Sequence, residues 1–250
     1  MLYGNTSISY YSRGNILIWL IMAFQAGLLN IGGFLAGQKI VSHVTGFATF
    51  SGYYISQGQK AYVIEMLILP IVFLLGAMVS GHFVDIRLKL NKQPKYYITF
   101  GFMFVLTLAV FINGIFGNWG AFGNVGHQSF GLLMLLCFIC GIQNATVSIV
   151  SRSVIRTTHL TGLTTDLGLG IVRFFKRKEL ESEVSGEGRS NLMRVGIISS
   201  FVMGAIVGGF VFKRFEFYGF LLPVLISGGL FSLMVYFHTW GRKNSINGQT

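Results

Sequence analysis

The chain has 250 residues, of which 52% are hydrophobic and only 11% are charged. Soluble domains carry about 25% charged residues, so this charge content excludes a soluble monomer, and the 24 Phe and 10 Tyr exclude a disordered chain. The sequence is therefore that of a polytopic membrane protein.

Six apolar stretches are each about 20 residues long, the length at which a helix crosses roughly 30 Å of hydrocarbon. They cover residues 16–36, 61–84, 97–117, 130–150, 192–212 and 217–238. Two shorter stretches, 44–57 and 160–175, are helix-like but richer in Thr, Gly and Ser. We therefore predict an all-α polytopic membrane helix bundle, a single membrane domain over residues 1–250, with about six spanning helices and two short re-entrant or broken helices.

Lys and Arg are distributed unevenly among the predicted loops. The balance of 19 Lys and Arg against 8 Asp and Glu gives a net charge of +11. If the two short segments enter the membrane and return to the same side, most basic residues share one side, including the block 173–194 with its loop at about 176–191. Basic loops are cytoplasmic in membrane proteins. We therefore predict a multi-pass protein with both termini in the cytoplasm.

An internal repeat is present in the sequence. The pattern H-x-T-G-x-x-T-x-x-G occurs at residues 43–52 and again at 159–168. Each copy follows a G-x-x-N element late in a spanning helix, and these elements are Gly27 to Asn30 and Gly141 to Asn144. Two motifs that recur in the same order indicate a duplication.

The two repeat halves, about 16–117 and 130–238, share one order of elements: a spanning helix, a short segment and two more spanning helices. Three crossings per half is an odd number, so the second half would be inserted upside down. Inverted repeats of this kind are typical of transporters, whose sites lie near the midplane where broken helices meet.

The two H-x-T-G segments would then enter from opposite faces, each with a helix N-terminus directed inward. Helix N-termini carry partial positive charge and unpaired N–H groups, so a pair of them favours an anion or a carbonyl-bearing solute. Thr45 and Thr161 are expected to cap these ends. Gly46 and Gly162 permit the turn and close backbone approach.

The candidate residues of a solute pathway are those of the two segments: His43, Thr45, Gly46, Thr49, His159, Thr161, Gly162, Thr165 and Asp166. An ionisable group inside a membrane indicates function by default, whereas a structural His would hydrogen-bond a neighbouring carbonyl. Asp166 either binds a cation or proton, or it complements a helix N-terminus. Asn30, Gln143 and Asn144 must point away from lipid, so they either support the site or join neighbouring helices.

Other chemistries are not indicated by the sequence. Cys137 and Cys140 form a C-x-x-C pair inside an apolar run with no further metal ligands beside it, so we expect packing residues. Motifs of phosphate-binding loops, serine hydrolases and zinc proteases are absent from the sequence. The basic charge is divided among loops and forms no nucleic-acid face. We predict no cofactor, no metal and no nucleic-acid partner; the lipid bilayer is the expected partner, and the state of homo-oligomerisation is left open.

The stretch from Arg156 to Gly168 (RTTHLTGLTTDLG) resembles the signature of the YoaK family of bacterial membrane proteins, a domain of unknown function. Supporting matches are Gly141-Ile142-Gln143-Asn144-Ala145, similar to the family's G-x-Q-N-A element, and Thr45-Gly46, similar to its T-G-N element. The chain departs from the family at Phe47, where Asn is usual. The resemblance covers residues 16 to 238 and implies a bacterial inner or plasma membrane setting, but no substrate and no mechanism.

The function that these features favour is a small-solute transporter or channel, not an enzyme, with its site between the two H-x-T-G segments and a small molecule or ion as substrate. Two alternatives remain open. A structural or accessory membrane protein would use the motifs only to lock the bundle. An intramembrane enzyme would use His159 as a base, oriented by Asp166, on a lipid-linked substrate.

Overall fold

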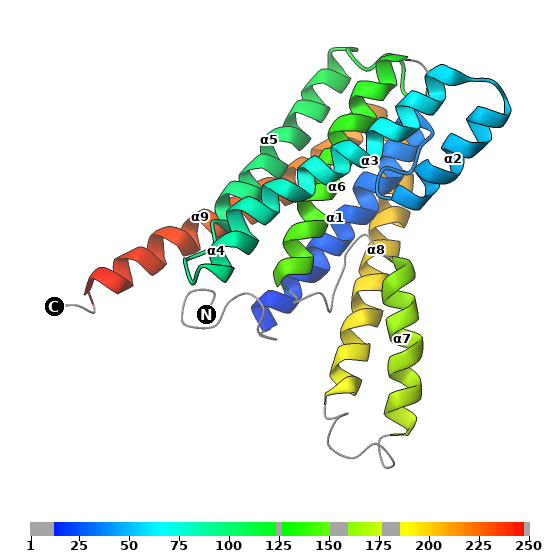
Figure 1. The fold of residues 1–250 in the computed structure, drawn as a ribbon. Helices are drawn as coiled ribbons and strands as arrows, with labels where there is room; N and C mark the ends of the chain where they lie inside the picture. Colours follow the sequence, from blue (N-terminus) through cyan, green and yellow to red (C-terminus); the bar gives the residue numbers. More distant parts are fainter. Residues whose placement is uncertain (1–12, 124–126, 151–159, 177–185, 248–250) are drawn as a thin grey trace.

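The structure is a computed structural model and describes residues 13–123, 127–150, 160–176 and 186–247 (Figure 1). The regular elements in these ranges are all helices. In chain order they are α1 (Arg13–Gly37), α2 (Val44–Ser56), α3 (Lys60–Ser80), η1 (Gly81–Asp85), α4 (Ile86–Lys89), α5 (Tyr96–Ile115), α6 (His127–Val150), α7 (Leu160–Phe175), α8 (Glu187–Phe215), η3 (Glu216–Phe220) and α9 (Leu221–Asn247). η1 is a π-helical turn and η3 is a 3-10 turn.

Five helical stretches are long and apolar enough to cross a membrane: Gly14–Gly37, Lys60–Lys89, Tyr96–Ile115, Ser129–Ile149 and Glu187–Thr239. The last stretch holds both α8 and α9, so the described part of the chain has six long helices beside the short α2 and α7. Large apolar side chains lie exposed on these helices, among them Leu67, Met78 and Val105, as contact with lipid requires. The prediction of a polytopic all-α membrane bundle is confirmed.

The two ends of α8 show one difference from the prediction and one reversal of chain direction. α8 begins at Glu187, so the C-terminal part of the basic loop predicted at about 176–191 is helical. Between α8 and α9, Glu216 has a φ of 50°, a left-handed backbone value that few residues other than glycine adopt. The chain turns back at this residue, and α9 returns along the bundle (Figure 1).

The most extensive helix contacts join one helix from each half of the chain. α1 packs along α8, and the two backbones meet at Gly27 and Gly204. A Cβ atom at Gly27 would overlap the Phe201 carbonyl oxygen, and a Cβ atom at Gly204 would overlap the Phe24 carbonyl oxygen. Only residues without a side chain allow two helix backbones to approach this closely.

α3 and α6 cross in the same way as α1 and α8. A Cβ atom at Gly76 would overlap the Phe138 carbonyl oxygen, and a Cβ atom at Gly141 would overlap the Phe73 carbonyl oxygen. Each of the four crossing glycines follows a Phe by three residues. Both crossings are therefore built from one F-x-x-G pattern that occurs in α1, α3, α6 and α8.

The two short helices lie beside this frame of crossed helices. α2 packs on α3, and α7 packs on α8. Both begin near the middle of the bundle and run toward opposite ends (Figure 1). We call the end with the α2–α3 connection the α2 end, and the end with the α7–α8 connection the α7 end. α5 and α9 pack on each other and complete the bundle.

Candidate functional site

A cavity of about 760 Å³ lies where α2 and α7 begin. Its lining comes from both halves of the chain and consists of Asn30, Ile40, Ser42, His43, Val44, Thr45, Pro70, Phe73, Leu74, Ala77, Leu160, Thr161, Gly162 and Phe201. The first residues of both short helices are in this lining, so the two helix N-termini reach the same space. Small-molecule sites occupy about 300–1,000 Å³, and this cavity falls in that range.

His43 immediately precedes α2 and lines the cavity. Its Nε2 atom lies 3.0 Å from the Thr45 hydroxyl oxygen, and its carbonyl accepts the Gly46 N–H at 2.9 Å. A Cβ atom at Gly46 would lie 2.6 Å from Nδ1 of His43. Glycine at this position therefore lets the imidazole lie against the first turn of the helix.

The prediction that Thr45 caps α2 is wrong. The N-cap residue is His43, and no side chain of the described residues makes a cap hydrogen bond there. Thr45 already lies inside the first turn, where its hydroxyl contacts the imidazole. Thr161 has the same place in α7, as the second residue of the helix. Because the Gly46 N–H is bonded to the His43 carbonyl, the N–H groups of Val44 and Thr45 are those left to water or to a solute.

Asn30 holds the segment that leads into α2. Its Oδ1 atom accepts hydrogen bonds from the Ser42 hydroxyl at 3.0 Å and from the Ser42 N–H at 3.3 Å. The neighbouring Val41 packs against Gly33, and the Val41 carbonyl accepts a hydrogen bond from Sγ of Cys137 at 3.2 Å. Asn30 therefore fixes the position of His43, the next residue along the chain.

The second motif contributes Thr161 and Gly162 to the cavity. His159, which the sequence predicts beside them, lies outside the described residues. A Cβ atom at Gly162 would meet no described atom within 4 Å. Within the described part of the chain, the space on the side of Gly162 is therefore open.

Among the described residues of the predicted pathway, Gly46, Thr49, Thr165 and Asp166 do not line the cavity. Thr49 donates to the Thr45 carbonyl and Thr165 to the Thr161 carbonyl, both at 3.0 Å, so each hydroxyl is bonded within its own helix. Asp166 is exposed on α7. Thr49, Thr165 and Asp166 lie a turn or more beyond the helix starts, whereas the cavity reaches only the first turn.

Gln143 and Asn144 lie on α6, outside the cavity lining. Gln143 is buried, and its Nε2 atom donates to the Met22 carbonyl, which joins α6 to α1. The buried Oδ1 atom of Asn144 has no hydrogen-bond partner in the described part of the chain. Asn144 therefore differs from Asn30, its counterpart in the G-x-x-N pattern.

Phe73 and Phe201 line the cavity, and neither was among the predicted site residues. Their carbonyl oxygens are contact points of the two glycine crossings, so the crossings place both side chains at the cavity wall. The repeated F-x-x-G pattern was a signal that could have found them. Phe47, the residue at which the chain departs from the YoaK pattern, is only 2% exposed and belongs to the core.

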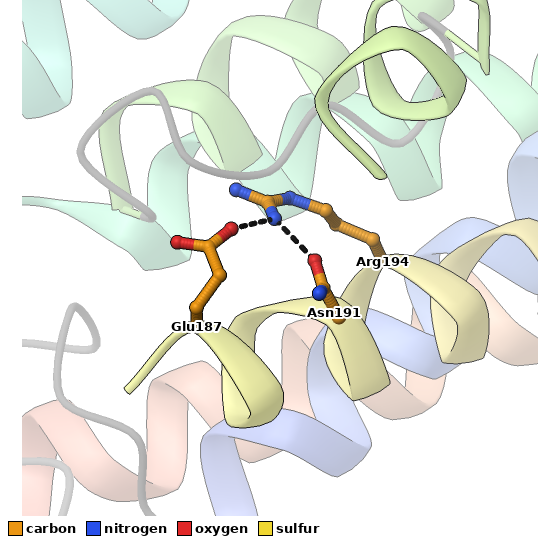
Figure 2. Close-up of polar contacts among 3 residues, drawn as sticks. All are labelled: Glu187, Asn191 and Arg194. Carbon is orange, nitrogen blue, oxygen red and sulfur yellow. Dashed lines mark hydrogen bonds and ion pairs between the residues drawn. The ribbon is translucent and has the colours of Figure 1, made fainter. Parts of the chain in front are cut away.

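A second polar cluster lies between α7 and α8 (Figure 2). Nη1 of Arg194 donates to Oε1 of Glu187 at 2.7 Å and to Oδ1 of Asn191 at 2.6 Å. The charged side chains are only 10% and 15% exposed, so the ion pair is largely buried. A Cβ atom at Gly170 of α7 would meet all three side chains. Arg194, part of the predicted basic block, is thus buried at a helix contact.

The comparisons with known proteins identify a family but no activity. The family model described as a protein of unknown function, DUF1275, matches residues 18–233, a range that contains the whole cavity lining. No curated protein and no solved structure matches the chain. The chain therefore belongs to the DUF1275 family of proteins of unknown function.

Proposed function

We propose that the protein is a small-solute transporter or channel of the bacterial plasma membrane, related to the YoaK proteins, and that the cavity is part of its pathway. The observation that carries this proposal is a single cavity lined by the first residues of two short helices from different halves of the chain. Transporters bind their substrates near the midplane, where discontinuous helices meet. We propose transport and not catalysis as the activity.

The proposal includes an inverted repeat, in which α1, α2, α3 and α5 correspond to α6, α7, α8 and α9. Under this correspondence α1 is equivalent to α6 and α8 is equivalent to α3, so the α1–α8 crossing is equivalent to the α6–α3 crossing. The F-x-x-G segment of each helix then corresponds to the F-x-x-G segment of its equivalent helix. The packing of α2 on α3 becomes that of α7 on α8. Such reciprocal contacts support two halves related by a two-fold axis in the membrane plane.

The charges support an orientation in which the α7 end faces the cytoplasm. Arg173 and Lys176 at the end of α7 and Arg189 at the start of α8 are exposed at this end. The positive-inside rule places such residues in the cytoplasm. In this orientation the α2 end faces the outside, and the two short helices enter the membrane from opposite sides.

The lining favours a polar solute without a strong positive charge. Among the described residues, the cavity lining contains no Asp, Glu, Lys or Arg. The groups that can bond a solute include the hydroxyls of Thr45 and Thr161, the imidazole of His43 and the N–H groups of Val44 and Thr45 at the start of α2. Helix N-termini attract negative charge. We propose a neutral polar solute or a small weak-acid anion as the substrate class.

One observation favours the structural alternative: the hydroxyls of Thr49 and Thr165 bond within their own helices. Cysteine labelling separates the two functions. On a background with Cys137→Ala and Cys140→Ala, the single substitutions Thr45→Cys and Thr161→Cys are treated with a membrane-impermeant thiol reagent from each side of sealed vesicles. A water-filled pathway predicts labelling at both positions, because both residues line the cavity.

Two control positions bracket this labelling experiment. Ser56→Cys, at the exposed end of α2, must react from one side only, and Leu132→Cys, which is 0% exposed, must not react. If Thr45→Cys and Thr161→Cys are as unreactive as Leu132→Cys in a folded protein, the cavity is dry. The transport proposal is then wrong, and the structural function stands.

Gly162→Trp is expected to narrow the cavity without disturbing the fold, because a Cβ atom there meets no described atom within 4 Å. We expect the labelling rate of Thr45→Cys to fall at least about tenfold, which corresponds to a barrier higher by about 1.4 kcal/mol. Gly168→Trp is the matched control, since a Cβ atom at Gly168 also meets no described atom within 4 Å and Gly168 lies outside the cavity lining. Equal labelling rates in the two variants would contradict the assignment.

A further inference from the structure

We propose that the cavity lies on the seam between two rigid helix units, and that the solute passes when one unit rotates against the other. This inference rests on the transport function proposed above. The α8 unit consists of α1, α7 and α8, and the α3 unit consists of α2, α3 and α6. Each unit contains helices from both halves of the chain.

The α8 unit is held together by backbone contact and by the buried ion pair. At Gly27 and Gly204 the backbones of α1 and α8 touch directly, so no side chain lies between them that could change its rotamer to let the helices slide. α7 is fixed to α8 because Gly170 rests on the Glu187–Asn191–Arg194 cluster (Figure 2). α7 therefore moves with α8.

The α3 unit is held together by equivalent contacts. The backbones of α3 and α6 touch at Gly76 and Gly141, and the Ser80 hydroxyl donates to the Ile142 carbonyl at 2.8 Å. α2 is fixed to α3 by the stacked rings of Tyr54 and Tyr62, whose centroids are 5.2 Å apart. α2 therefore moves with α3.

The cavity walls divide between the two units. The α8 unit contributes Asn30, Leu160, Thr161, Gly162 and Phe201, and the α3 unit contributes Val44, Thr45, Pro70, Phe73, Leu74 and Ala77. The remaining lining residues belong to the segment that connects α1 with α2. A rotation of one unit against the other therefore changes the cavity while leaving both glycine crossings intact.

Two polar contacts lie across the seam on opposite sides of the crossings: one joins the units directly, and the other joins the α8 unit to the segment before α2, which Sγ of Cys137 in α6 ties to the α3 unit through the Val41 carbonyl. α1 crosses α8 at Gly27, with its N-terminus toward the α7 end (Figure 1). The bond between Asn30 and Ser42 lies on the side of the α2 end. The bond from Gln143 to the Met22 carbonyl lies on the side of the α7 end. Each bond therefore closes the seam at one end of the bundle.

Distances between pairs of spin labels in lipid nanodiscs test the two units. Exposed positions serve as label sites on the background without cysteines. The pair Ile64/Phe210 spans the seam at the α2 end. The pair Leu90/Leu192 spans it at the α7 end, where Leu90 directly follows α4 in the helical stretch that continues α3. The pair Leu17/Leu192 lies within the α8 unit. We expect two distance populations for both seam pairs and one narrow population for the pair within the unit.

Removing one seam bond is expected to open the seam at that end. Asn30→Ala removes both hydrogen bonds from Ser42 and should raise the longer-distance population of Ile64/Phe210 at least about fivefold relative to the shorter one, the size expected from a single hydrogen bond. Gln143→Leu should do the same for Leu90/Leu192. Ser42→Ala repeats the first test with a smaller change, since the Ser42 N–H still donates to Asn30.

The distances are read without any solute, so they separate this inference from the proposed function. If all three label pairs give one narrow population in every variant, or if Leu17/Leu192 changes together with the seam pairs, the two-unit arrangement is wrong. If the cavity cysteines are labelled but the spin-label distances stay fixed, the protein is a static channel and the two-unit arrangement is wrong. Moving units with an unreactive cavity would instead contradict the transport function alone.

Discussion

Gly27→Ala is expected to lower the free energy of unfolding by about 3 kcal/mol, at the upper end of the usual cost of overpacking. The new Cβ atom would overlap the Phe201 carbonyl oxygen of α8. A flexible side chain can move away from an added methyl group, but the backbone of a helix cannot. α1 and α8 must therefore separate along a contact that runs through the middle of the bundle. Thermal unfolding in detergent measures the loss as a midpoint lower by about 6–12 °C.

Two comparisons make the prediction for Gly27 specific to the crossing. Gly209→Ala, in α8, places its Cβ atom in open space, so it should raise stability by up to about 1 kcal/mol through helix propensity. Adding Gly204→Ala to Gly27→Ala should cost less than the sum of the single variants, because both open one crossing, whereas Gly141→Ala should add fully. Equal costs for Gly27→Ala and Gly209→Ala would contradict the backbone contact.

Glu187→Met is expected to destabilise the protein by about 3 kcal/mol, because it leaves the buried guanidinium of Arg194 without its carboxylate partner. Arg194→Met should cost less, since Glu187 is the first residue of α8 and the helix N-terminus still stabilises its charge. The double variant should recover most of the stability, because two apolar side chains replace two buried charges. Thermal unfolding of the three variants measures the order.

The ion pair between Lys89 and Asp85 is the matched control for this series. Its atoms are 2.8 Å apart, close to the distance in the buried pair, but the Lys89 side chain is 73% exposed. Lys89→Met should therefore change stability by less than about 1 kcal/mol. If Glu187→Met costs no more than Lys89→Met, the cluster between α7 and α8 does not hold these helices together.

The helices could be predicted from the sequence because a bilayer places a strict requirement on the length and hydrophobicity of a spanning segment. A spanning helix needs an unbroken apolar run of a certain length, and the runs at 61–84 and 97–117 became α3 and α5 with small changes at their ends. The short segments 44–57 and 160–175 were also recognisable, since their Thr and Gly content sets them apart from the spanning runs. Both kinds of signal are local in sequence.

Other features could not be predicted, because they depend on distant parts of the chain. Arg194 was counted as a loop charge because its burial depends on Gly170 of another helix. Asp166 was included in the predicted pathway because it belongs to the same motif. A sequence motif does not indicate how far a cavity extends along a helix, and Asp166 lies outside the cavity lining. Phe73 and Phe201 were missed because a Phe in an apolar helix gives no signal of its own. Their place beside the cavity depends on which helix crosses at that point.

The glycine crossings also determine how late in synthesis the helix bundle can complete its folding. Gly27 meets its partner only after Gly204 has been made, at roughly 5–20 residues per second and so about ten seconds or more later. Until then the surface of α1 around Gly27 cannot make its contact with α8. In the same way, α3 cannot make its contact at Gly76 until α6 has been synthesised. Neither half can form its crossings alone. Two separately produced halves are therefore expected to reach the folded state only when they are combined.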